Sequence, residues 1–331
     1  MQSFWQSLSK PFFVLAPMEE VTDTVFRRII SSCGRPDVMV TEFTSVEGLA
    51  SEIGRSKVIH RLQYTPEEQP LVAQIWGITP EHYYQAGVYA REQGFAGLDI
   101  NMGCPVKKVI KQGACSALIK NPQLASDIIQ AAKEGVGDIP VSVKTRIGFS
   151  EIQTEEWIGH LLQSHLDALT IHGRTVKELS DYPTHWDEIG KAVNLRDALS
   201  PHTLIIGNGD ILSYEQGLDI ATQYGVDGIM IGRGVFHNPW IFNPNIDHNT
   251  LSTEIKVQKL IEHIQLFDQT WGQEKNFAVM KKCFKMYLNN FPGASDIRSQ
   301  LMQCNTAEEC IEILRSIMNK MRYIVDKMRF V

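Results

Sequence analysis

Short apolar or β-branched segments recur along the first three quarters of the chain, each bounded by Gly, Pro or polar residues. Each segment is followed by a stretch long enough for a helix. Eight such segments can be distinguished, at 13–16, 38–41, 71–75, 97–100, 141–144, 168–171, 204–207 and 228–231. The intervening stretches 80–93, 122–134 and 155–165 place apolar residues at helical spacing, and Pro80 and Pro122 suit a first helical turn. Eight alternations of strand and helix predict an α/β fold, a closed (β/α)8 TIM barrel.

The main competing fold is an open doubly wound sheet. Such a sheet carries a Gly-x-Gly-x-x-Gly turn after its first strand. Residues 16–20 read Ala-Pro-Met-Glu-Glu instead, which disfavours that fold.

The pattern changes after Trp240. Residues 243–250 are rich in Asn, Asp and Pro and indicate a linker or a short crossing loop. Ser252 or Thr253, and Thr306, are candidate N-caps of the helices that follow. Four segments have helical patterns, at 251–271, 277–291, 295–304 and 306–329. We therefore predict two domains, a barrel over residues 1–245 and a small all-helical domain over residues 246–331.

Composition fits a folded protein with a large core, because 43% of the 331 residues are hydrophobic and 21% are charged. Six cysteines without CxxC or Cys/His spacing indicate neither a zinc site nor a disulfide framework. No signal-peptide pattern opens the sequence, and no window approaches the roughly 18 apolar residues of a membrane helix. We expect a cytoplasmic monomer without a membrane partner or a metal.

Charge is distributed unevenly, although the formal net charge is only -6. Residues 250–331 carry 12 Lys and Arg against 9 Asp and Glu, whereas residues 1–249 carry 20 against 29. The last quarter is therefore basic and the barrel region is acidic.

Polar residues follow the predicted strands at their carboxyl ends, where barrels of this type place their active sites. They are Gln74, Asn101, Cys104, Lys144, Arg146, His172, Arg174, Asn208, Gly209, Asp210, Gly232 and Arg233. The last five follow the seventh and eighth strands, where glycine amides and a cation commonly bind phosphate. A ligand that carries phosphate is predicted.

Lys144 extends into the barrel mouth, where a lone ammonium is costly without an electron-rich partner. A reduced flavin is such a partner, and an amide such as Gln74 can bond the edge of the ring. The simpler alternative is an ion pair between Lys144 and Asp99 or another acid. Cys104 could be a small buried hydrophobe, but its loop at the rim favours a reactive thiol, either a general acid or a nucleophile.

Taken in order, these residues resemble the tRNA-dihydrouridine synthases over about three quarters of the chain. The motifs that carry the resemblance are Ala16-Pro17-Met18, Val21-Thr22-Asp23, Thr41-Glu42-Phe43, Asp99-Ile100-Asn101-Met102-Gly103-Cys104-Pro105, Lys144-Thr145-Arg146-Ile147-Gly148, His172-Gly173-Arg174-Thr175, Asn208-Gly209-Asp210 and Gly232-Arg233-Gly234.

The resemblance implies an FMN-dependent reduction of a D-loop uridine in tRNA to 5,6-dihydrouridine, with NADPH as electron donor. Reduced FMN delivers hydride to C6 and Cys104 protonates C5, while Asn101 and Arg146 contact the base. The positions that correspond to FMN-binding residues are Pro17, Met18, Glu19, Gln74, Lys144, His172, Asn208, Gly209, Asp210, Gly232 and Arg233. Two departures from the family pattern stand out, Cys115 at a position where glycine is usual and Glu19-Glu20 where small residues are commoner.

A stacked uracil cannot reach a flavin in a barrel mouth, so the nucleotide must be extruded and the RNA held in place. Lys281, Lys282, Lys285 and Arg298 of the basic C-terminal segment are candidates for phosphate contacts. The alternative for these four residues is an ordinary solvated helix face. Alternative functions are an FMN-dependent barrel oxidoreductase acting on a free pyrimidine or other small molecule, and an RNA-binding module with an incidental flavin.

Overall fold

The structure is a computed structural model that describes residues 3–272 and 274–329, with side chains as far as residue 320. The last two residues of the predicted helical domain lie outside this range. All strand pairings are parallel. The strands are β1 (Phe12–Leu15), β2 (Val38–Val40), β3 (Thr44–Ser45), β4 (Leu71–Trp76), β5 (Gly97–Met102), β6 (Val141–Arg146), β7 (Ala168–His172), β8 (Leu204–Asn208) and β9 (Gly228–Ile231).

Eight of these strands close into a barrel. Their order runs from β4 through β5, β6, β7, β8 and β9 to β1 and β2, and β2 pairs again with β4. The short β3 pairs with β4 beyond this ring. Each predicted apolar segment coincides with a barrel strand to within two residues at either end, so the predicted (β/α)8 class is confirmed.

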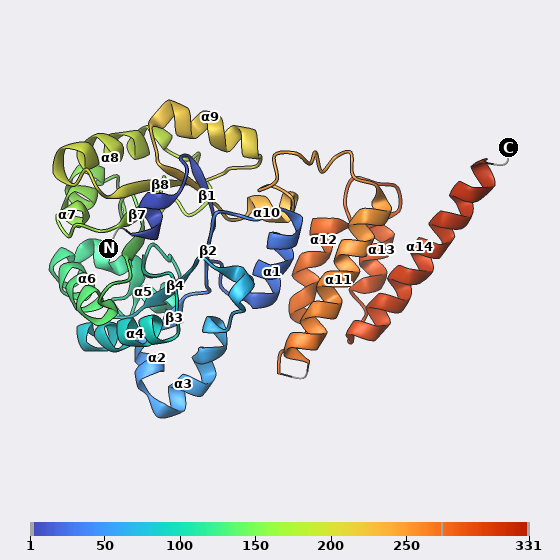
Figure 1. The fold of residues 1–331 in the computed structure, drawn as a ribbon, viewed down its shortest axis with the longest axis horizontal. Helices are drawn as coiled ribbons and strands as arrows, with labels where there is room; N and C mark the ends of the chain where they lie inside the picture. Colours follow the sequence, from blue (N-terminus) through green and yellow to red (C-terminus); the bar gives the residue numbers. More distant parts are fainter. Residues whose placement is uncertain (1–2, 273, 330–331) are drawn as a thin grey trace.

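Helices surround the barrel (Figure 1). They are α1 (Thr24–Cys33), α2 (Val46–Ala50), α3 (Glu52–Val58), α4 (Pro80–Glu92), α5 (Lys107–Ile110), α6 (Pro122–Val136), α7 (Gly159–Leu162), α8 (Trp186–Leu199), α9 (Tyr214–Tyr224) and α10 (Gly234–His237). Short 3-10 turns are η1 (Phe4–Ser7), η2 (Ile59–Leu62), η3 (Pro66–Glu68) and η4 (Cys115–Lys120). The predicted helix 155–165 is a π-helical turn, η5 (Thr154–Ile158), followed by α7, and the helical stretch stops before His165, which has a left-handed φ of 48°.

Alternation along the strands separates two sets of core residues. Phe12, Val14 and Ala16 fill the barrel interior together with Val38, Val72 and Ile206, and Trp5 of η1 packs against the same set. Phe13 and Leu15 point outward into the layer between strands and helices. Side chains alternate along a strand, so Lys144, His172 and Asn208 also point into the barrel. They lie above its apolar interior, at the carboxyl ends of the strands.

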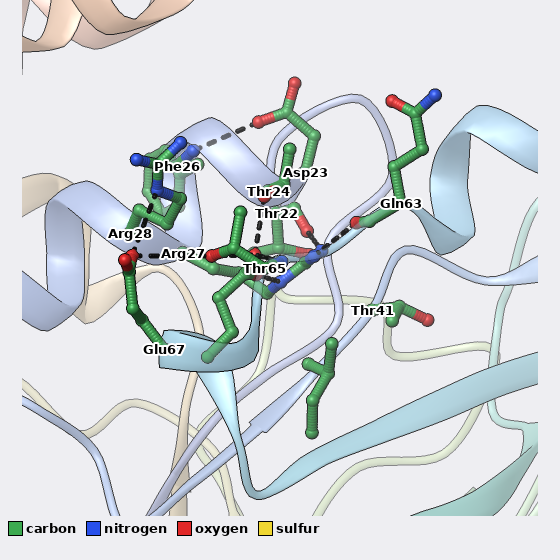
Figure 2. Close-up of polar contacts among 12 residues, drawn as sticks. Thr22, Asp23, Thr24, Phe26, Arg27, Arg28, Thr41, Gln63, Thr65 and Glu67 are labelled. Atoms are coloured by element: carbon green, nitrogen blue, oxygen red, sulfur yellow. Dashed lines mark hydrogen bonds and ion pairs between the residues drawn. The ribbon is translucent and has the colours of Figure 1, made fainter. Parts of the chain in front are cut away.

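A buried ion pair secures the segment that follows β1. Arg27 and Glu68 are both fully buried, with 2.6 Å between Arg27 Nε and Glu68 Oε2. Figure 2 shows the guanidinium also donating to the carbonyls of Thr22 and Gln63, at 2.7 and 2.8 Å. Asp23 caps α1 by accepting from the amide of Phe26. These bonds fix residues 18–23, which form part of the barrel mouth.

The C-terminal part is a bundle of helices on one side of the barrel, next to α1 and α10 (Figure 1). It contains α11 (Thr253–Trp271), the 3-10 turn η6 (Phe277–Cys283), α12 (Phe284–Tyr287), α13 (Ala294–Leu301) and α14 (Ala307–Arg329). The predicted N-caps Ser252 and Thr306 accept from the amides of Ile255 and Glu309. The predicted helix 277–291 is instead split and stops at Tyr287, because Asn290 is left-handed and Pro292 follows it.

The bundle is joined to the barrel by apolar and charged contacts. Phe26 of α1 packs against His263 of α11, and one apolar core runs through both parts. Lys275 pairs with Asp23 at 2.8 Å and Lys282 pairs with Glu20 at 2.9 Å. None of the helices described here is long and apolar enough to cross a bilayer.

Candidate active site

A cavity of about 420 Å³ opens at the carboxyl ends of β1, β6, β7, β8 and β9. This volume lies in the range of small-molecule and cofactor sites. Nine of the eleven residues predicted to bind cofactor line it, namely Pro17, Met18, Lys144, His172, Asn208, Gly209, Asp210, Gly232 and Arg233. The structure therefore brings together residues that are more than 200 positions apart in the sequence.

Lys144 lies on the floor of the cavity. Its Nζ donates to Asn208 Oδ1 at 3.2 Å, and Asn208 in turn donates to the Met230 carbonyl at 2.8 Å. Asp99 bonds Gln74 and Ser142 rather than Lys144, so the alternative ion pair is not formed. Burial, followed by the positive charge of Arg146, lowers the pKa of Lys144 to about 8. Lys144 is therefore charged near pH 7 and retains hydrogen-bonding capacity toward the cavity.

His172 lies beside Lys144 on the same floor. Burial lowers the pKa of His172 well below its usual value, and the charges of Lys144, Arg146 and Arg174 act in the same direction. The imidazole is therefore neutral at physiological pH. It can exchange hydrogen bonds with a ligand but adds no charge to the site.

The loops after β8 and β9 form the cationic end of the cavity. Asp210 pairs with Arg174 and, at 3.0 Å, with Arg233, whose side chain is 60% exposed. Gly209 has a φ of 144°, and a Cβ there would lie 2.5 Å from Thr184, so packing requires glycine. A Cβ at Gly232 would meet Ala16 and Met18 at ordinary distances of 3.5 and 3.7 Å. Protein packing therefore leaves room at Gly232, and its main chain is open to a ligand.

Cys104 is held in a loop that leaves β5 beside Lys144, since Asn101 and Lys144 are register partners. Asn101 Oδ1 accepts from the amides of Gly103 and Cys104, both at 3.0 Å. Asn101 Nδ2 donates to Gln74 Oε1 at 3.0 Å, and Gln74 Nε2 donates to Asp99 at 2.7 Å. The loop geometry thus depends on a buried polar chain across β4, β5 and β6.

The Cys104 thiol is half-buried and more acidic than an ordinary cysteine. A hydrogen bond from Cys115 is the main cause that lowers its pKa to about 7, and an amide bond from Val106 and the Arg146 charge add to it. Arg146 is itself buried, and its guanidinium donates to the carbonyls of Gly103, Thr175 and Leu179. Arg146 therefore ties the Cys104 loop to the loop after β7.

Two predicted cofactor residues do not line the cavity. Gln74 is 0% exposed, and both ends of its amide are bonded to Asp99 and Asn101. Glu19 turns toward Arg61 and accepts from its Nε and Nη2 at 3.0 and 2.8 Å. Both side chains hold neighbouring segments in place in this structure.

The predicted RNA-binding residues lie on the bundle, away from the cavity lining. Lys281 donates to the Met302 carbonyl at 2.7 Å, Lys282 pairs with Glu20, and Arg298 donates to the Leu288 carbonyl. The Lys285 side chain is exposed, with no ion pair or hydrogen bond to the described side chains. Lys285 is thus the one of these four that is ready to meet a phosphate without rearrangement.

Sequence reasoning missed Ser180, Leu212 and His237, which also line the cavity. Ser180 and Leu212 lie in loops after β7 and β8, and His237 ends α10. No motif marks these positions, and only the folded loops bring them to the ligand space. Among the described residues, no cluster of His, Cys, Asp and Glu is placed to hold a metal.

The family model and the curated relatives that match the chain name the same family. The family model described as "Dihydrouridine synthase (Dus)" matches residues 14–322. A "Probable tRNA-dihydrouridine synthase" of Staphylococcus aureus (strain MRSA252) is 43% identical over 315 residues, which are 95% of each chain. A "Probable tRNA-dihydrouridine synthase 2" of Bacillus subtilis (strain 168) is 44% identical over 315 residues, 95% of this chain and 96% of that one. A solved structure, morphinone reductase in complex with tetrahydroNAD, is similar with a TM-score of 0.47 and 13% identity over 71% of this chain and 86% of that chain.

Proposed function

The chain belongs to the dihydrouridine synthase family, and from this premise we propose that it is a tRNA-dihydrouridine synthase. The proposed reaction reduces the C5=C6 bond of a D-loop uridine in tRNA, with FMN as cofactor and NADPH as electron donor. One observation carries the proposal. A single cavity holds a buried cation, Lys144, and a cationic glycine-lined end, and an acidic thiol, Cys104, stands next to it.

The residues present fit FMN. Gly209, Gly232 and Arg233 offer amides and a cation to a phosphate. Lys144 would face the part of the ring that becomes negative on reduction, and His172 and Asn208 would hold it by hydrogen bonds. When bound, FMN supplies the hydride that adds to C6 of the uracil.

Cys104 would supply the proton. With a pKa of about 7, its thiol form and thiolate form are almost equally populated at neutral pH, which is the optimum for an acid that must give up a proton. The proton goes to C5, and the thiolate left behind is stabilised by Arg146. Asn101 would act through Cys104 by keeping its loop formed, in addition to any contact with the base.

We also propose that residues 1–245 form the catalytic domain and residues 246–331 a tRNA-binding domain. The target nucleotide must leave its stack to reach the cavity, so the tRNA must be held outside it. Lys285 would contact phosphate directly, while Lys281, Lys282 and Arg298 would first give up the internal partners described above. The substrate and donor imply a cytoplasmic location, and a monomer suffices for this arrangement.

The test is the visible spectrum of the purified protein under anaerobic conditions, first with NADPH and then with unmodified tRNA. We expect flavin bands that bleach with NADPH and return with tRNA, and tRNA that gains two hydrogens by mass spectrometry. Cys104→Ala should bleach normally but lose about 10²- to 10⁴-fold in recovery rate. Full recovery by Cys104→Ala would show that the acid is another group. Bleaching without recovery on any tRNA would instead indicate a reductase of a small molecule.

A further inference from the structure

A second thiol touches Cys104. Cys115 begins the 3-10 turn η4 and is 0% exposed, in a small buried cluster with Val109 and Ala114. Cys104 packs against this cluster. The proposed reaction uses Cys104 and leaves Cys115 without a role, although Cys104 packs against the cluster that contains Cys115.

The backbone around Cys115 is unusual for a residue with a side chain. Its φ is 52°, in the left-handed region that favours glycine. Residues that keep such a conformation in a buried place are often there for function, because the fold alone would be better served by glycine. The neighbouring Ser116 Oγ donates to the Cys104 carbonyl at 2.7 Å, so the segment is fastened directly to the Cys104 loop.

The two thiols differ in acidity because their surroundings differ. Burial raises the pKa of Cys115 well above its usual value, so Cys115 keeps its proton at neutral pH and acts as a donor. Cys104 receives that hydrogen bond and also faces the Val106 amide and the charge of Arg146, while Glu19 opposes them. When the surroundings separate the pKa values of two neighbouring groups in this way, the group with the lower pKa is the one that transfers the proton.

We propose that Cys115 is a positioning residue that donates its S–H to the Cys104 sulfur and so sets the direction and the acidity of the Cys104 proton. The role of this hydrogen bond in catalysis rests on the proposed function, whereas the hydrogen bond itself can be tested without it. In the reaction, the proton leaves Cys104 for carbon and the Cys104 thiolate accepts the hydrogen bond. Cys104 then regains a proton from water. Cys115 keeps its own proton throughout, so no oxidant or reductant is needed.

The experiment measures alkylation of Cys104 by iodoacetamide against pH, followed by peptide mass spectrometry of the full-length flavin-loaded protein without tRNA. Wild type should show a midpoint near pH 7. Cys115→Ala and Cys115→Gly should raise the midpoint by about one pH unit, since the hydrogen bond to the thiolate is lost. Cys115→Ser retains a hydrogen-bond donor, so its alkylation midpoint should stay close to that of wild type.

The controls separate this role from a structural one. Cys304→Ser changes a buried cysteine of the bundle and should leave the midpoint where it is in wild type. Cys115→Gly relieves the left-handed backbone, so a folding defect in Cys115→Ala does not prevent the test. An unchanged midpoint in both Cys115→Gly and Cys115→Ala would overturn the proposal.

The same variants can be followed with tRNA. The pH at which flavin reoxidation is half-maximal should move together with the alkylation midpoint, and bleaching by NADPH should be unaffected. If wild type reduces no tRNA, the proposed function fails while the alkylation midpoints still decide the pairing of the two thiols. If reoxidation occurs with the same pH profile in Cys115→Ala and wild type, Cys115 does not position the acid.

Discussion

Asn101 allows a direct test of how the Cys104 loop is held. Asn101→Ala removes three side-chain hydrogen bonds, two from the amides of Gly103 and Cys104 and one to Gln74. At about 1 kcal/mol each, the free energy of unfolding should fall by about 3 kcal/mol. The Cys104 sulfur would also lose its fixed position, and a displacement of about 1 Å can cost about 10²-fold in rate.

Three measurements test whether Asn101 holds the Cys104 loop, namely urea unfolding, the alkylation rate of Cys104 without tRNA, and flavin reoxidation by tRNA. Asn101→Asp keeps acceptor oxygens for the amides of Gly103 and Cys104, so it should disturb the alkylation rate of Cys104 less than Asn101→Ala does, although it loses the bond to Gln74. If Asn101 acts only by contacting the base, the alanine variant would show normal unfolding and normal alkylation, and only reoxidation would slow. That combination would refute the reasoning from the hydrogen bonds.

Three further predictions concern stability, charge and docking. Arg27→Met leaves the buried Glu68 carboxylate without its cation and should lower the free energy of unfolding in urea by about 3–5 kcal/mol. Arg27→Met combined with Glu68→Leu should recover most of this loss. Lys144→Met should lower the midpoint potential of bound FMN by about 30–90 mV at pH 7. This difference should begin to shrink as pH rises above about 8, where Lys144 starts to lose its proton in the oxidised state; a constant difference up to pH 9.5 would assign the effect to another group. Lys275→Met removes the pair with Asp23 and should weaken docking of the bundle by about 1 kcal/mol, seen as a raised KM for tRNA with unchanged bleaching by NADPH; an unchanged KM would show that this ion pair does not help to hold the bundle in place.

The barrel could be predicted because parallel strands covered on both faces appear as nearly continuous apolar runs. Val141 to Arg146 illustrates the limit of this signal, since its apolar start gives way to the polar residues of the site. The helices were harder to place. Residues 277–291 have a helical pattern of apolar positions, but the segment is a 3-10 turn followed by a short helix that ends before the left-handed Asn290 and Pro292, and local geometry of that kind leaves little trace in periodicity.

The cavity could be predicted from the rule that active sites lie at the carboxyl ends of barrel strands. The rule fails for side chains whose partners come from elsewhere. The Gln74 side chain points into the barrel, but it forms hydrogen bonds with Asp99 and Asn101 of the adjacent strand. Glu19 forms hydrogen bonds with Arg61. Lys282 was predicted from the basic charge of its segment and its place on a helix face, and neither shows that Glu20 lies opposite.

Hydrogen-bond saturation separates the two kinds of polar residue in this site. Asn101, Gln74 and Arg146 are buried and bonded within the protein at both ends of their polar groups. Lys144 has a single bonded partner among the described residues, and Arg233 is largely exposed. Since a buried polar group with few partners is costly, Lys144 is expected to gain most from a ligand, and the exposed Arg233 can turn toward one without losing buried bonds. Substitutions of the first set should therefore lower stability and thiol reactivity together, whereas substitutions of the second should change ligand binding with little effect on unfolding.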